Sequence, residues 1–113
     1  MRILGFSKEW DKLKQDEFTT FRFSRRDRDW EVGEVVQVVY KPRSKEREVL
    51  GVVEIVSKEA RCFAVGTRHC TTREEAIEDG FSGFQEMRKW LLQTHGKRVD
   101  EEWMNKLTLR WVR

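Results

Sequence analysis

The sequence predicts a single α+β domain that combines a small barrel-like sheet with two main helices. Two segments with helix caps and apolar side chains at helical spacing lie at residues 72–80 and 83–96. The 113 residues, of which 38% are hydrophobic, suffice for one modest core, so we expect one domain over residues 1–113. Period-two alternation or a high content of β-branched side chains marks strands at residues 17–23, 35–40, 49–57 and 107–111.

The first expected element is a short helix from Ser7 to Gln15. Ser7 is a typical N-cap residue, and an acidic side chain follows in the first turn. Trp10 and Leu13 form an apolar pair at i, i+3. We therefore expect this helix to rest on the core through Trp10 and Leu13.

The strand that follows is the most informative segment of the chain. Because side chains alternate along a strand, Thr20 and Arg22 should share one face while Phe21 and Phe23 share the other. A hydroxyl beside a guanidinium suits a phosphate, a carboxylate or a base edge. The alternative is a polar strand face, on which Arg22 pairs with Glu54 or another carboxylate of a neighbouring strand.

The middle of the chain predicts a hairpin. Residues 24–29 form a polar loop, and Gly33 suits a tight turn before the next strand. Val35–Tyr40 is almost entirely β-branched or aromatic, as expected of a central strand buried on both faces. Lys41–Glu48 is expected to be an exposed loop. In the strand after it, Gly51 interrupts the pattern, which indicates a bulge or a barrel bend.

The two cysteines lie in an ambiguous segment, Arg61–Cys70, which is either an irregular connection or a hairpin with its tip near Gly66. In a hairpin, Cys62 and Cys70 would face each other, close enough for a disulfide. Two reduced thiols are the alternative, favoured in a mesophile. Cys-x7-Cys with His69 lacks the paired spacing of a zinc site, so we expect no metal.

The remaining elements are helical until the last strand. Thr72–Glu75 is a capping box that begins a short helix ending at Gly80. A second helix begins at Ser82 or Gly83 and ends at Gly96. Its apolar stripe, expected in the core, comprises Phe84, Met87, Trp90 and Leu91.

The last segment should be a short turn and a strand. Asp100 is expected to cap the turn, which contains Trp103 and Met104. Leu107, Leu109 and Trp111 then alternate with polar residues along the strand. The expected barrel core comprises Phe21, Phe23, Val36, Val38, Val53, Ile55, Leu107 and Leu109.

Composition narrows the function classes. The 23 Lys and Arg residues against 20 Asp and Glu give a net charge of +3, so any nucleic-acid site must be local. High mixed charge with one proline is typical of hyperthermophile proteins. There is no apolar run of about 18 residues and no signal-peptide pattern, so we expect a cytoplasmic protein with no membrane partner. No Walker or Rossmann loop and no nucleophile elbow occurs, and we expect no cofactor.

Several motifs in order resemble the ASCH family of the PUA-like superfamily. They run from the Thr20-x-Arg22 strand through the turn Val32-Gly33-Glu34 to Thr72-Arg73-Glu74-Glu75-Ala76 and Asp79-Gly80-Phe81. The resemblance covers nearly the whole chain. It implies a small PUA-like mixed β-barrel of about five or six strands with helices packed against one side.

The resemblance also implies a ligand cleft between the barrel and the helices. The family is thought to bind RNA or nucleotide-like ligands there, and a small-ligand sensor or protein-interaction module is the remaining alternative. The expected binding residues are Thr20, Arg22, Asp79, Gly80 and Phe81, with Arg25, Arg26 and Lys41 meeting phosphates.

An enzymatic alternative comes from the same resemblance. Some family members are amidohydrolases that act on N4-acetylcytidine, with a catalytic Lys three residues before the Thr of Lys-x-x-Thr-x-Arg. This sequence has Glu17 at that position, which argues against the same mechanism because a carboxylate cannot replace the amine. The candidate catalytic residues are Thr20, Glu17 and Asp79, and Lys14 is one helical turn upstream.

Overall fold

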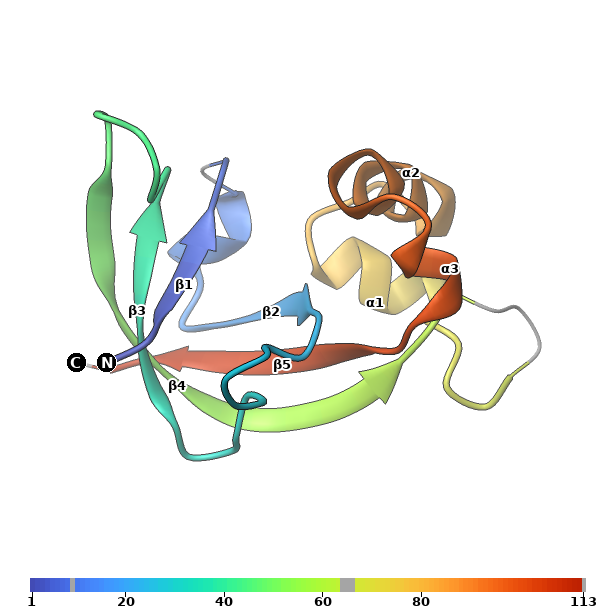
Figure 1. Cartoon of the computed structure of the whole chain (residues 1–113), viewed down its shortest axis with the longest axis horizontal. Helices are drawn as coiled ribbons and strands as arrows, with labels where there is room; N and C mark the ends of the chain where they lie inside the picture. The colour runs from blue at the N-terminus through green and yellow to red at the C-terminus, as the bar shows by residue number, and fades with distance from the viewer. Residues whose placement is uncertain (9, 64–66, 113) are drawn as a thin grey trace.

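The computed structural model describes residues 1–8, 10–63 and 67–112 as an α+β domain with a five-stranded half-barrel and three helices, which confirms the predicted class and the lower strand count. The half-barrel and the helices form two lobes joined by the long strands that run beneath both (Figure 1). The elements in chain order are β1 (Ile3–Phe6), the 3₁₀ turn η1 (Asp11–Lys14), β2 (Glu17–Arg22), β3 (Val35–Tyr40), β4 (Glu48–Arg61), α1 (Arg73–Glu78), α2 (Phe84–His95), α3 (Arg98–Glu101) and β5 (Met104–Trp111).

The sheet is mixed, with the strand order β1-β3-β4-β5-β2. β1 pairs in parallel with β3, and the other neighbours are antiparallel. β4 is 14 residues long and bends, so that its first half pairs with β3 and its second half with β5. The predicted irregularity at Gly51 is confirmed: its φ is +148°, and the register shifts opposite Val38 and Val39.

Two hydrophobic clusters hold the fold together. Both sides of β2 are covered, because Phe18 enters the first cluster while Phe21 enters the second. The prediction that Phe21 and Phe23 belong to the barrel core is therefore wrong; both pack on the helix side. The first cluster comprises Leu4, Phe6, Phe18, Trp30, Val36, Val38, Val53, Ile55, Leu107 and Leu109. The second comprises Phe21, Phe63, Ala76, Met87, Leu91, Val99 and Met104.

The N-terminal segment differs from prediction. Ile3–Phe6 is a strand, and the expected helix over residues 7–15 is reduced to the single turn Asp11–Lys14. Trp10 precedes that turn with an extended backbone, so Ser7 does not cap a helix. Trp10 and Leu13 do pack against the barrel core, as expected.

The helical lobe follows the local signals closely. Thr72 Oγ1 accepts a hydrogen bond from the Glu75 N–H, and Glu75 Oε1 accepts one from the Thr72 N–H, which confirms the capping box. α2 begins after Gly83 and ends before Gly96. The prediction for Asp100 is wrong, because it lies within α3 and pairs with Arg88 on α2, while Met104 begins β5.

In the described part of the cysteine segment, Cys62 and Cys70 lie side by side, but not in the antiparallel pairing of a hairpin. The Cys62 N–H donates to the His69 carbonyl and the Thr71 N–H donates to the Cys62 carbonyl, so Cys62 and Cys70 pair in a parallel bridge. No disulfide joins the two thiols. The predicted tip, Gly66, lies outside the described residues. No helix in the described ranges is long and apolar enough to cross a membrane.

Candidate functional site

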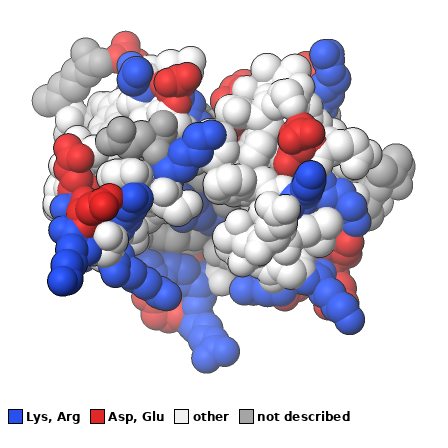
Figure 2. All heavy atoms as spheres, turned by 90° about the horizontal axis from the view of Figure 1, so that it is seen from above, with Lys and Arg blue, Asp and Glu red and all other residues white. Residues whose placement is uncertain are grey.

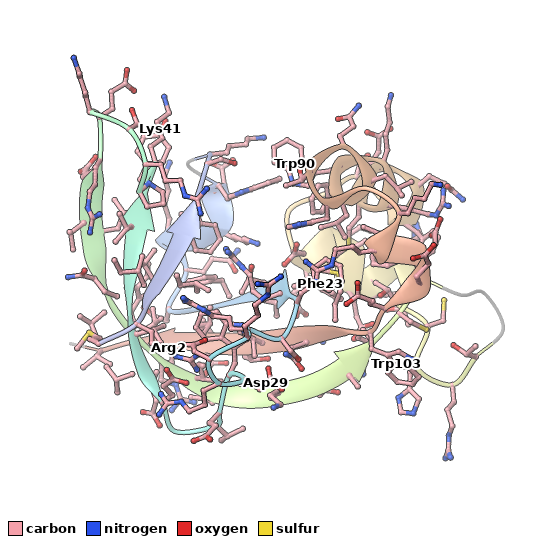
Figure 3. The ribbon with its side chains drawn as sticks, viewed as in Figure 1. Arg2, Phe23, Asp29, Lys41, Trp90 and Trp103 are labelled. Atoms are coloured by element: carbon pink, nitrogen blue, oxygen red, sulfur yellow. The ribbon has the colours of Figure 1, made fainter. Side chains whose placement is uncertain are left out.

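A cleft of about 730 Å³ lies between the half-barrel and the helical lobe. It is visible from above as the hollow between the two lobes (Figure 2). Because β1 and β2 are the two edges of the open sheet, residues from both line the cleft, and α2 supplies the opposite wall. Lys41, beside the half-barrel, and Trp90, on α2, lie on opposite sides, with Phe23 below them (Figure 3).

Positive charge is concentrated in this cleft. Among the described residues that line it, six are lysines or arginines and Asp79 alone is acidic. The whole chain, in contrast, is nearly balanced at +3. The six cationic side chains are Lys12, Arg22, Arg25, Lys41, Arg43 and Arg98. The aromatic side chains beside them are Phe6, Trp10, Phe21, Phe23, Trp30, Phe81 and Trp90.

A buried ion pair lies at the floor of the cleft. Lys12 Nζ is 3.0 Å from Asp79 Oδ1, and only 5% and 7% of the two side chains are exposed. Thr19 Oγ1 donates a second hydrogen bond, of 3.2 Å, to the same oxygen. Burial lowers the pKa of the Lys12 amine and raises the pKa of the Asp79 carboxyl, in each case against the attraction of the other. The proton affinities of the amine and the carboxylate therefore approach each other.

Arg22 extends the polar floor from β2. Its Nε donates a 3.1 Å hydrogen bond to Thr20 Oγ1, and its guanidinium lies 4.7 Å from the centre of the Phe6 ring. Burial lowers the pKa of Arg22 to about 10, partly offset by the charge of Asp79. Glu54, the expected alternative partner, lies opposite Arg110 in the register of β4 and β5, whereas Arg22 lies opposite Asn105. Among the described residues, Arg22 therefore forms no ion pair with a carboxylate of a neighbouring strand.

Most of the predicted binding residues line this cleft. They are Thr20, Arg22, Arg25, Lys41, Asp79 and Phe81. Gly80 lies outside it, in a smaller pocket behind Trp10. Arg26 is exposed and does not line the cleft.

Two candidates for the chemistry lie away from the cleft. Glu17 is on the outside of the sheet, where it accepts hydrogen bonds of 2.7 and 2.9 Å from Arg110. The side chain of Lys14 is 85% exposed and lies near Asp11. Neither residue can act on a ligand in the cleft.

Sequence reasoning missed Lys12, which is the buried amine of this site. In the sequence it lies between Asp11 and Lys14, which are both exposed, and a single 3₁₀ turn leaves no helical periodicity to mark the inward position. It also missed Thr19, because alternation assigned that residue to the apolar face. The only available signal was the proximity of Lys12 to Trp10 and Leu13, which were expected in the core.

Comparisons with protein-family models, with curated proteins and with solved structures found no match to this chain. The resemblance to the ASCH family therefore remains a prediction from motifs. In the described part of the chain, no three His, Cys, Asp or Glu side chains are grouped so that they could hold a metal ion. The function must be inferred from the cleft itself.

Proposed function

We propose that this chain is an ASCH-like module of the PUA-like type that binds RNA, or a nucleotide-like ligand, in the cleft between its two lobes. The observation that carries the proposal is the concentration of six cations and several aromatic rings around a single carboxylate. Cations neutralise phosphates, and aromatic faces stack on bases without regard to their sequence. Both requirements of nucleotide binding meet in one concave site.

The size of the cleft favours a single strand. A volume of about 730 Å³ is within the range of small-ligand sites and can hold a nucleotide, whereas a duplex is too wide to enter. The rings of Trp10 and Trp90 are 5.3 Å apart, and those of Trp10 and Phe81 are 5.0 Å apart. This aromatic wall offers a stacking surface beside the cations.

Salt-dependent binding of RNA tests the proposal. Fluorescence anisotropy of a labelled single-stranded RNA should show an affinity that falls as salt is raised, because phosphate contacts release counterions. Arg43→Ala removes a cation of the cleft rim and should weaken binding several-fold, with a salt slope smaller by about one. Arg47→Ala, in the same exposed loop but outside the cleft, is the matched control and should bind as wild type does. Equal losses in the two variants, or no binding at low salt, would refute the proposal.

A second candidate function, amide hydrolysis on a modified nucleoside, is favoured by one observation. The Lys12 amine and the Asp79 carboxyl are buried together in the cleft, with their pKa values shifted towards each other. A neutral Lys12 could accept a proton from attacking water, and a protonated Asp79 could donate one to the leaving amine. Lys12 thus supplies, from η1, the kind of amine that position 17 lacks.

Release of acetate from N4-acetylcytidine tests this candidate. Lys12→Met and Thr20→Ala should each abolish the release, because one removes the amine and the other a hydroxyl of the cleft floor. Glu17→Gln is the control and should keep full activity, because Glu17 lies outside the cleft. A wild-type protein that releases no acetate would leave RNA or nucleotide binding as the function of the cleft.

A further inference from the structure

Arg22 differs from the other partly buried arginines of the described chain. Arg2 is held by Glu34 at 2.6 Å, and Arg61 is held by Glu75 at 2.9 Å. No carboxylate among the described residues lies within 4.0 Å of Arg22, which contacts the Thr20 hydroxyl and the Phe6 ring. A buried cation without a counterion is unfavourable, and elsewhere this protein avoids it.

The unused donors of Arg22 face the cleft. Its Nε is bound to Thr20, while the two terminal nitrogens form no hydrogen bond with the described residues. Neither nitrogen is enclosed, since the one buried side-chain atom that lacks a partner in the described chain is Trp30 Nε1. Arg22 lines the cleft, so these nitrogens are open to it. They form the planar fork that binds carboxylates and phosphates.

The surroundings of Arg22 also favour an anion. Asp79 attracts Arg22, but its Oδ1 is already occupied by Lys12 and Thr19. On the helical side, His95 and Arg98 line the same cleft, and both contact the Phe23 ring, at 5.1 and 4.0 Å. With Lys12 and Asp79 both ionised, the floor carries one net positive charge from Arg22, which a singly charged anion would neutralise.

We propose that Arg22 is the centre of an oxyanion subsite, in which its terminal nitrogens bind a phosphate or carboxylate group of the ligand next to His95. The inference rests on the proposed function: if the ligand is a nucleotide, the group bound by Arg22 is its phosphate. It deepens that function by assigning one anionic group to a fixed position at the floor of the cleft. The other cations then meet the rest of the ligand nearer the rim.

His95 provides a direct readout of this subsite. Partial burial, together with the charges of Arg98 and Arg22, lowers the pKa of His95, so an anion bound between these groups must raise it. The only other histidine of the chain is His69, which packs 4.8 Å from the Trp103 ring and does not line the cleft. An NMR titration of the two imidazole rings therefore separates local binding from a general effect of salt.

The experiment titrates wild-type protein with pH in sodium phosphate, in sodium acetate and in sodium chloride of equal ionic strength. Phosphate should raise the pKa of His95 and leave that of His69 unchanged, relative to chloride. Arg22→Gln should abolish the response, whereas Arg110→Gln, which removes an exposed arginine on the outer face, should keep it. A response to acetate alone would support the subsite with a carboxylate as its anion and would overturn the reading that it holds a phosphate of the nucleotide. A wild-type His95 that responds to neither anion would overturn the subsite whether or not the variants fold.

Failure of the subsite and failure of the proposed function give different results. If phosphate moves His95 but single-stranded RNA does not bind at low salt, the subsite stands and RNA binding is refuted. If RNA binds equally to wild type and to Arg22→Gln, RNA binding stands and the subsite is refuted. If both stand, Arg22→Gln should bind adenosine monophosphate at least tenfold more weakly while its binding of unphosphorylated adenosine changes little.

Discussion

Replacing Lys12 with Met tests the buried ion pair at the cleft floor. Lys12 Nζ lies 3.0 Å from Asp79 Oδ1, and 5% and 7% of the two side chains are exposed. Met keeps most of the aliphatic stem but removes the cation, whose Nζ lies 5.6 Å from the centre of the Phe6 ring and 5.3 Å from that of Trp10. The Asp79 carboxylate then keeps one hydrogen-bond donor among the described side chains, the Thr19 hydroxyl.

The expected loss of stability follows from that burial. Removing one partner of a buried pair costs about 3–5 kcal/mol, because an uncompensated charge remains. This is a large share of the roughly 5–15 kcal/mol by which a typical domain is stable. The double variant Lys12→Met, Asp79→Asn removes both charges and should regain most of the lost stability. Its free energy of unfolding should lie within about 1 kcal/mol of that of wild type.

The loss in Lys12→Met should also depend on pH. Burial already raises the pKa of Asp79 above its ordinary value of 3.8, and removing the Lys12 charge raises it further. A group whose pKa is raised on folding contributes stability that is fully present below the ordinary value and is lost as pH rises through the folded value. The stability of Lys12→Met should therefore be closest to that of wild type near pH 4, and the difference should grow as the pH increases. The double variant should lack this trend.

Urea denaturation from pH 4 to 8, followed by tryptophan fluorescence, measures these differences. Lys14→Met is the matched control: that side chain is 85% exposed, so its loss should change stability by less than about 0.5 kcal/mol. If Lys12→Met loses no more than the control and its loss does not vary with pH, the pair at the cleft floor is not a buried ion pair.

Two further predictions concern the wall of the cleft and the stability of the fold in acid. Gly80→Ala should destabilise the protein by about 1–3 kcal/mol in thermal unfolding, because φ at Gly80 is +110° and a Cβ would lie 2.9 Å from the Trp10 ring. The control Gly83→Ala should be nearly neutral, because a Cβ at Gly83 would meet no atom within 4 Å. Hydrogen bonds from Arg2 hold the pKa of the Glu34 carboxyl at about 2. Burial raises the pKa of the Glu75 carboxyl, but hydrogen bonds from Arg61 and Lys106 outweigh it and hold that pKa at about 2 as well. Their stabilisation is therefore present above pH 4.5 and lost as pH falls towards 2. Glu34→Gln and Glu75→Gln should each flatten the acid limb of the stability profile; an unchanged limb would contradict this reasoning.

The elements that sequence predicted well are those whose signals are local. The Thr72–Glu75 capping box, the Val-rich strand β3 and the bend at Gly51 each depend on a few neighbouring residues, and all are present. The strand Ile3–Phe6 was missed because it is defined by parallel pairing with β3, more than 30 residues away. The helix expected over residues 7–15 is only a single turn in the structure. The backbone of Trp10 is extended, and its ring packs on Phe81 and Trp90.

The candidate site was predictable only where a motif existed. Thr20 and Arg22 were selected from the alternation along their strand and from the family resemblance, Asp79 from the resemblance, and all three line one cleft. Alternation along β2 was applied correctly, yet it could not show that helices cover the second face, so Phe21 was assigned to the wrong cluster. Lys12 had no motif, because its inward direction follows from the tertiary packing of a single turn.

The cleft exists because the sheet does not close into a complete barrel. β1 and β2 are the edges of the sheet and are not paired with each other. In this parallel pairing, every second residue of β1, namely Arg2, Leu4 and Phe6, forms main-chain hydrogen bonds with β3. The main-chain groups of Ile3 and Gly5 therefore face away from β3. Both residues line the cleft. Under the proposed function, this edge would let a base hydrogen-bond to the main chain of Gly5 without competing with the sheet. A side chain at this position would also meet Pro42, since a Cβ would lie 2.8 Å from its Cγ. The open edge of β1 thus adds main-chain donors and acceptors to a cleft whose side chains supply the charge and the stacking surface.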